Sequence, residues 1–513
     1  MKKKFRVLKY PVLFLTIAAL IFVLAWSQTT SAQRPTTRAY KFKKTTGITI
    51  PIATRGDFDD RLSLDPSIPQ KKDAVIQLAQ KLYLPEREEI KEECGEGPFG
   101  RLFISLTNPD IPDAARDEVD NIIDANTPSL PKTYTSGHFK FYYTDNDLNS
   151  NHNVTLSEIQ ATAIVLNNAW SNFAQNFIEP KHYITSIGDC PPRPRKMVNV
   201  KVYDLGSSLY GATSSYWNYI MLHSRFVVKD SCKRQSTSAH ELFHRVQYSY
   251  GYVSGNSIYK WAVEGTASWA QKYKAPNVGD WMRRMNQGLN SPDLTLISGR
   301  AYNACHFWVY LGQRGNGEVA TIKDVWSNFK TNGHDMKAAV ETTIQSRVPN
   351  GSSMDQFVGW WNFANFYKDI TNASPSFDYA EDELEKICGG ITYGPLAQVP
   401  RITRNLNVGS SHTINGTVAP YGADYYVFNI GSSVQRIKIK CTGATLNFGY
   451  AVIEIKNDMM VDYESTPAGQ KKDYDFKKTI APGRLSHVAF IVIGNPQGGN
   501  YSIEAKGSLL PIK

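Results

Sequence analysis

The spacing of apolar and polar positions predicts the secondary structure of the first half of the chain. Period-two alternation at residues 138–143 and 197–203 predicts two strands, because successive side chains of a strand point to opposite faces. Between them, residues 156–177 carry apolar side chains at helical spacing behind Thr155, a good capping residue, and predict one long helix. Residues 216–228 predict a further strand or hairpin. We therefore expect a strand, a helix and two more strands before the central helices.

The middle of the chain has a helical pattern, and its last section does not. Residues 237–273 predict two helices joined by a loop at 251–256, and helical patterns recur at 302–311 and 322–329. From about Arg401 onward, short β-rich runs alternate with Gly, Asn and Pro turns. This change of pattern is typical of a β-sandwich of roughly 110 residues.

The first 32 residues have the pattern of an export signal. Basic residues precede an apolar run from Pro11 to Trp26, and Thr30, Ser31 and Ala32 supply the small residues of a cleavage site. We expect cleavage after Ala32 and a secreted, extracytoplasmic protein. Because the apolar run of about 16 residues is close to the shortest length that spans a bilayer, an uncleaved membrane anchor is the alternative.

Three further segments follow the signal at residues 1–32. Residues 33–131 are rich in charge and proline, with one helical pattern at about 72–83, and favour a pro-region; a permanently packed N-terminal extension is the alternative. We expect an α+β fold, in which residues 132–396 combine a mixed sheet with helices and residues 401–513 form the β-sandwich.

The composition is that of a folded protein, with 42% hydrophobic and 20% charged residues. The formal net charge of +10 is misleading, because five basic and no acidic residues lie in the predicted signal. The remaining 52 Lys and Arg residues against 47 Asp and Glu residues leave an excess of only +5. Without a basic tract or a nucleic-acid-binding motif, this excess gives no reason to expect DNA or RNA as a partner.

The six cysteines are an even number, which makes disulfides plausible in an exported protein. They include no CxxC pair, so we do not expect a zinc site made of cysteines. Cys190 and Cys232 bracket one sheet region and are the pair that we prefer.

The segment His240-Glu241-Leu242-Phe243-His244 is an HExxH motif. Two imidazoles four residues apart on a helix are about 40° apart in projection and one turn apart along the axis. Both can therefore reach one Zn²⁺ ion, and Glu241 can reach a water on that ion rather than the ion itself.

A third candidate ligand lies on the next predicted helix. Glu264 follows His244 by 20 positions, in a run that is otherwise apolar and rich in small residues. An unpaired carboxylate would be costly to bury there, and a metal ion would remove that cost. A catalytic zinc needs three protein ligands and a fourth coordination position that stays open. His240, His244 and Glu264 can supply the three ligands.

This arrangement resembles the gluzincin branch of zinc metallopeptidases, the class of thermolysin and of zinc aminopeptidases, over about 30 residues. Metzincins would need Gly and His in place of Gln247 and Tyr250, and aspzincins would need an Asp ligand. The chain departs from thermolysin at Val263, where that family has Asn, and at Ser268, where its Asp orients a zinc-bound His. The resemblance therefore leaves the orienting partner of the histidines unidentified.

The resemblance also implies a donor for the oxyanion of the transition state. Tyr302 resembles the tyrosine that gluzincin aminopeptidases place on a later helix, and His306, one turn further on, is the rival donor. Either residue could instead be an ordinary packing position.

The C-terminal section resembles the pre-peptidase C-terminal type of β-sandwich found on secreted bacterial proteases, on the strength of residues 415–428 and 499–503. Its role by resemblance is secretion, autoinhibition or substrate anchoring. A plain spacer is the alternative.

Together these patterns predict a secreted zinc-dependent peptidase with a zincin-like catalytic domain, Zn²⁺ as cofactor and Glu241 as general base. Its expected partners are peptide or protein substrates, with no nucleic acid and no membrane beyond the signal. The alternatives are an inactive zincin scaffold that serves as a secreted binding or adhesion protein, and a structural protein with an accidental HExxH.

Overall fold

The computed structural model describes residues 127–181, 197–369 and 379–509, apart from short gaps at 207–208, 214–218, 253–258, 381–385, 389–390, 444–447, 458, 472 and 482, and a few positions between 73 and 119. The predicted signal at 1–32 and nearly all of the predicted pro-region at 33–131 lie outside the described residues. The described positions between Asp73 and Ala79 are helical.

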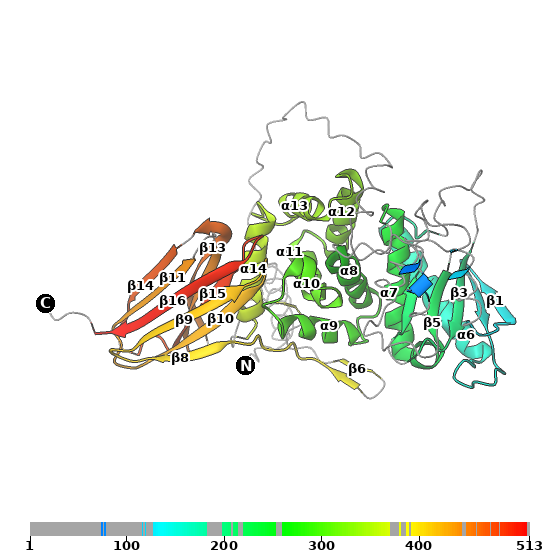
Figure 1. Ribbon diagram of the computed structural model, residues 1–513, viewed down its shortest axis with the longest axis horizontal. Coiled ribbons are helices and arrows are strands. Elements are labelled where there is room, and N and C mark those ends of the chain that lie inside the picture. Colours follow the sequence, from blue (N-terminus) through cyan, green and yellow to red (C-terminus); the bar gives the residue numbers. More distant parts are fainter. Residues whose placement is uncertain are drawn as a thin grey trace, which may run out of the picture. The chain divides into compact units, whose positions relative to one another are not determined.

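The N-terminal part of the described chain is a five-stranded mixed sheet in the order β1-β2-β3-β5-β4 (Figure 1). Strands β2 and β3 and strands β3 and β5 are parallel, whereas the outer pairs β1–β2 and β5–β4 are antiparallel. The short strand β4 is therefore an edge of this sheet. The strands are β1 (Lys132–Ser136), β2 (Phe139–Tyr143), β3 (Val198–Tyr203), β4 (Gly211–Thr213) and β5 (Tyr219–His223).

The strands predicted at 138–143 and 197–203 are confirmed as β2 and β3. The predicted long helix is α6 (Leu156–Asn176), which begins at a capping box formed by Thr155 and Glu158. The prediction at 216–228 is only partly right, because β5 ends at His223 and a π-helical turn follows it. The His223 ring accepts hydrogen bonds from the next backbone amides and so ends the strand.

The predicted helix pair at 237–273 is confirmed as α7 (Ser231–Ser249) and α8 (Lys260–Lys274), which pack against each other. Helix α7 begins six residues before the predicted start, where the Asp230 side chain accepts hydrogen bonds from the amides of Cys232 and Lys233. The remaining helices are α9 (Asp280–Leu289), α10 (Leu296–Gly299), the 3₁₀ turn η3 (Tyr302–Ala304), α11 (Cys305–Arg314), α12 (Glu318–Thr331), α13 (Met336–Arg347) and α14 (Met354–Tyr367).

A disulfide joins Cys232, in the first turn of α7, to Cys388. The pairing of Cys232 with Cys190 expected from the sequence is therefore wrong, and Cys190 itself lies outside the described residues. The true partner stands 156 positions away in a two-stranded hairpin, β6 (Lys386–Cys388) and β7 (Ile391–Tyr393), a distance that spacing along the chain cannot reveal. Disulfides persist mainly in oxidising compartments. Among the described helices, none has the length and apolarity to cross a bilayer.

The C-terminal strands form two facing sheets, β13-β12-β15-β10-β8 and β14-β11-β16-β9, so the described chain is α+β with a C-terminal β-sandwich. Their apolar side chains enclose a core of their own. The strands are β8 (Ile402–Leu406), β9 (Ser411–Val418), β10 (Ala423–Ile430), β11 (Arg436–Gly443), β12 (Phe448–Lys456), β13 (Met459–Lys471), β14 (Asp473–Thr479), β15 (His487–Ile493) and β16 (Gly499–Ser508).

The position of strand β15 between two hydrophobic cores explains why its sequence is a continuous apolar run and does not alternate with polar residues. Val488 and Phe490 pack in the sandwich core, whereas Ala489 and Ile491 belong to the larger core that contains the helices. The sheet that contains β15 is therefore covered on both faces, on one of them by α14. The hydroxyl of Tyr425 donates to the backbone oxygen of Asn362 in α14 at 3.0 Å. One hydrophobic core therefore contains residues from both sides of the predicted domain boundary near residue 401.

Candidate metal centre

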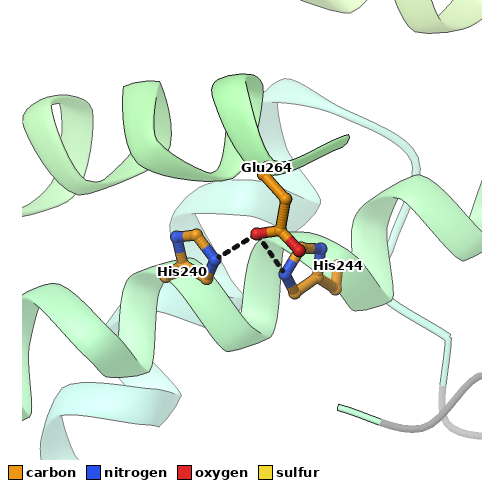
Figure 2. A group of neighbouring side chains, drawn as sticks. All are labelled: His240, His244 and Glu264. Atoms are coloured by element: carbon orange, nitrogen blue, oxygen red, sulfur yellow. Dashed lines mark hydrogen bonds and ion pairs between the residues drawn. The ribbon is translucent and has the colours of Figure 1, made fainter. Parts of the chain in front are cut away.

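Three buried side chains converge between α7 and α8 (Figure 2). His240 and His244 lie one turn apart on α7, with ring centroids 4.8 Å apart. Glu264 reaches toward them from α8, and its Oε2 lies 3.1 Å from Nε2 of His240 and 3.8 Å from Nε2 of His244. One donor atom from each residue falls within 4.8 Å of the others. The structure thus brings together the three ligands that the sequence predicts.

A small residue next to Glu264 lets α8 pack closely against α11. Gly265 follows Glu264 directly, and a Cβ atom at Gly265 would lie 2.5 Å from the indole ring of Trp308 in α11. The same indole donates its N–H to the backbone oxygen of Trp261 at 2.7 Å. Helix α8 is therefore clamped between α7 and α11, and this fixes the position of the Glu264 carboxylate.

Burial sets the protonation state of His244. Removal from water lowers its pKa to about 4, although the neighbouring Glu264 carboxylate acts in the opposite direction. The ring is therefore neutral near pH 7, which is the form that binds metal ions. A divalent cation bound beside the Glu264 carboxylate would offset the cost of burying its charge. Within the described part of the chain, no other group of His, Cys, Asp or Glu side chains is close enough to share an ion.

Gln247 is the orienting partner of His244, a role that the sequence left open. Its Oε1 lies 2.8 Å from Nδ1 of His244, while its Nε2 donates to the backbone oxygen of Val263 and to Oγ1 of Thr266. These two acceptors fix the orientation of the amide, so Nδ1 of His244 carries the proton and Nε2 faces Glu264. The sequence could have indicated this contact, because Gln247 follows His244 by three residues on the same predicted helix, a spacing at which side chains meet.

The Glu241 side chain contacts the edge strand β4 of the sheet. Oγ1 of Thr213, at the end of β4, donates to the Glu241 carboxylate at 2.8 Å. At Gly211 a Cβ atom would lie 2.7 Å from the same carboxylate, so the edge strand needs glycine there to approach α7. The carboxylate is thus held by the edge strand in a pocket that His240 also lines.

The two candidate oxyanion donors have different surroundings. Tyr302, in η3, lines a pocket with His240 and Glu241, and its ring centroid lies 5.8 Å from that of His240. His306 is fully buried outside the pocket lining, against Trp361, with Nδ1 2.7 Å from the backbone oxygen of Asn303. Burial, and secondarily a nearby arginine, lowers the pKa of His306 well below its ordinary value. The placement favours Tyr302 over His306.

The pocket beside the two motif residues, which we call the α7 pocket, has walls that sequence reasoning missed. They come from five separate segments of the chain, so no local spacing could have grouped them. Besides His240 and Glu241, the pocket is lined by Tyr210, Thr237, Gln271, Asp280, Arg284 and Tyr302.

The sequence matches no described protein family and no curated protein. Three similar solved structures each cover about a fifth of this chain. The pre-peptidase C-terminal domain of a collagenase from Bacillus anthracis is 16% identical over 21% of this chain and 97% of that domain, with a TM-score of 0.17. The Yersinia pseudotuberculosis-derived mitogen is 16% identical over 20% of this chain and 89% of its own, with a TM-score of 0.15.

A family 11 carbohydrate-binding module of a Clostridium thermocellum cellulase is 9% identical over 20% of this chain and 86% of the module, with a TM-score of 0.13. Similarities at this level do not assign the chain to a family. The candidate function therefore follows from the chemistry of the site.

Proposed function

We propose that the chain is a zinc-dependent peptidase of the gluzincin type, with His240, His244 and Glu264 as the metal ligands. The observation that carries the proposal is the convergence of these three buried side chains from two packed helices, with a separate carboxylate, Glu241, beside them. Two imidazoles and one carboxylate form the ligand set of a catalytic zinc with an open coordination position.

Zinc bound there would act as a Lewis acid on the peptide carbonyl and on a water molecule. Glu241 is the general base: it takes a proton from the attacking water and returns it to the departing amine. The hydrogen bond from the Thr213 hydroxyl holds the Glu241 carboxylate in place. Tyr302 donates a hydrogen bond to the developing oxyanion. An extended substrate pairs with the edge strand β4, where its backbone adds to the sheet.

We also propose that the protein works outside the cytoplasm. The disulfide between Cys232 and Cys388 anchors the first turn of the helix that carries the motif. A structural bond of this kind is rare where thiols are kept reduced.

The proposal is tested by incubating the purified protein with a mixed peptide library and identifying products by mass spectrometry. We expect cleavage that stops when a chelator removes the metal and returns when zinc is added back. Tight zinc binding with no cleavage of any peptide would contradict the peptidase proposal and support a binding scaffold.

Replacing Gln247 with Ala is expected to weaken zinc binding by about 10- to 100-fold, the usual effect of losing a partner that orients a metal-bound histidine. The ring of His244 loses the acceptor for its Nδ1 proton, and its Nε2 is no longer aimed at Glu264. Chelator competition measures the change. Gln235→Ala, at an exposed position on the same helix, is the matched control and should bind zinc normally. Equal affinities of the two variants would contradict the role of Gln247.

A further inference from the structure

The outer face of one C-terminal sheet carries three lysines side by side. In this sheet the strands β14, β11, β16 and β9 are neighbours (Figure 1), and alternate residues of β11 are buried in the sandwich core. Lys438 of β11 lies directly opposite Lys477 of β14 and Lys506 of β16, and we call these three residues the lysine row. Because residues two apart on a strand share a face, Arg436 and Lys440 lie beside the row. Opposite side chains are about 4.5–5.5 Å apart at Cβ, where like charges repel and destabilise a sheet.

The acidic side chains of this face offset only part of that charge. Asp475 contacts Nζ of Lys477 at 2.5 Å, and Glu504 contacts Nζ of Lys506 at 2.6 Å. These contacts lower the pKa of both acids, which are therefore charged at neutral pH. Neither lysine of β11 makes an ion pair within the part of the chain that the structure describes. With Asp473, the face has three acids against five basic side chains, and all three acids lie on one side of the lysine row.

A hollow of about 530 Å³ lies on the same sheet, over the ends of β9, β11 and β16. Its volume is in the range of small-molecule binding sites. Thr442 follows Lys438 by four residues on β11, so the hollow begins about 13 Å from the lysine row. Oγ1 of Thr417 donates to Oδ1 of Asn500 at 2.6 Å and orients that amide. The lining has no charged residue, and its outward side chains carry hydroxyl or amide groups: Asn415, Thr417, Thr442, Asn500 and Ser502.

We propose that this face binds an anionic polysaccharide. The lysine row and Arg436 contact its sulfate or carboxylate groups, and the hollow holds a sugar ring whose hydroxyls bond to the amide and hydroxyl side chains. Lysine suits this task, because its ammonium group is a point charge that needs no fixed ligand geometry. The repulsion within the row is relieved when the polyanion is bound.

The chemistry of the face favours a polysaccharide over other polyanions. Every outward residue on the four described strands is polar, whereas a helix or sheet that binds a membrane surface needs apolar side chains that enter the lipid. The outward positions of these strands also include no aromatic ring on which a nucleic-acid base could stack. An acidic peptide would match the lysines but not the uncharged hollow beside them.

The test measures binding of the purified protein to fluorescein-labelled dextran sulfate, with uncharged dextran of the same length as the matched probe. We expect binding of the sulfated polymer alone, with an affinity that falls linearly on logarithmic axes as the salt concentration rises. Equal binding of both polymers, or binding of neither, would overturn the inference. No peptidase activity is required, so the result is independent of the proposed function.

Lys438→Gln/Lys440→Gln should weaken binding of dextran sulfate by roughly 25-fold, at about fivefold for each lysine beside an anionic surface. The slope of the salt dependence should fall by about 2. Lys323→Gln/Lys330→Gln, which removes two charges from exposed positions of α12, is the matched control and should bind like the parent. Lys438→Gln alone should raise the melting temperature without polymer, because it removes the middle charge of the row, and this excludes a folding defect. A β11 double variant that binds as tightly as the parent would overturn the inference.

Asn500→Ala tests the hollow. It should weaken binding of dextran sulfate by about 2- to 10-fold and leave the salt dependence unchanged, because it removes a hydrogen bond and no charge. Poly-glutamate and vesicles that contain phosphatidylserine serve as competing polyanions, and both should bind more weakly than dextran sulfate. Tighter binding of either competitor would overturn the inference, since the face would then fit an acidic protein or a membrane.

Discussion

Replacing Glu241 with Gln is expected to lower peptide turnover by at least about 100-fold while the zinc content stays near that of the parent protein. General-base catalysis typically contributes about 10²- to 10⁴-fold, and an amide cannot take the proton from water. Gln has the same shape as Glu, and its oxygen can still accept the hydrogen bond from Thr213. Steady-state kinetics together with elemental analysis measure both quantities on one preparation.

Glu504→Gln is the matched control, because this carboxylate is partly exposed on β16, far along the chain from the motif. It should have the activity of the parent. If Glu241→Gln cleaves peptides as fast as the parent while both carry zinc, the HExxH helix is not the catalytic centre, and the binding-scaffold alternative should replace the peptidase proposal.

Replacing Glu264 with Ala should abolish both zinc binding and activity. The substitution removes one of three ligands and leaves two imidazoles to hold the ion. The metal-free variant should remain folded, since Ala suits a helix interior and no buried carboxylate is left to balance. Thermal melting measures the effect directly, because zinc that binds only the native state raises the melting temperature of the parent.

For Glu264→Ala, we expect the stabilisation by added zinc to vanish, whereas Glu241→Gln should keep it. Near 100 times the dissociation constant, that stabilisation is about 2.7 kcal/mol for a single site. A Glu264→Ala variant that still gains the full shift would show that the ion is bound elsewhere.

The sequence predicts the helices and strands well where one period dominates. Strands β2 and β3 alternate on a half-buried sheet, and α6 has a capping box and one apolar face, so local chemistry and tertiary packing agree. The secondary structure of residues 216–228 was predicted only in part, because the chain after β5 continues into a buried π-helical turn that the ring of His223 caps. An apolar run alone does not distinguish these two conformations.

The grouping of the three candidate ligands could be predicted, because helical geometry fixes His240 and His244 on one face and a short connection leads to the adjacent helix that carries Glu264. The residues that surround the site could not be predicted from the sequence. Thr213 and Arg284 reach it from β4 and α9, through contacts that leave no period in the sequence. The partner of Cys232 was missed for the same reason, since pairing depends on the folded chain.

The most direct test of the central claim is a crystal structure of the zinc-loaded protein with anomalous data collected on both sides of the zinc absorption edge. The account predicts one strong anomalous peak per chain, bonded to His240, His244 and Glu264, with Glu241 beside it and not bonded to it. A structure from zinc-saturated crystals with no peak at these residues, and with the contact between His240 and Glu264 unchanged, would contradict it.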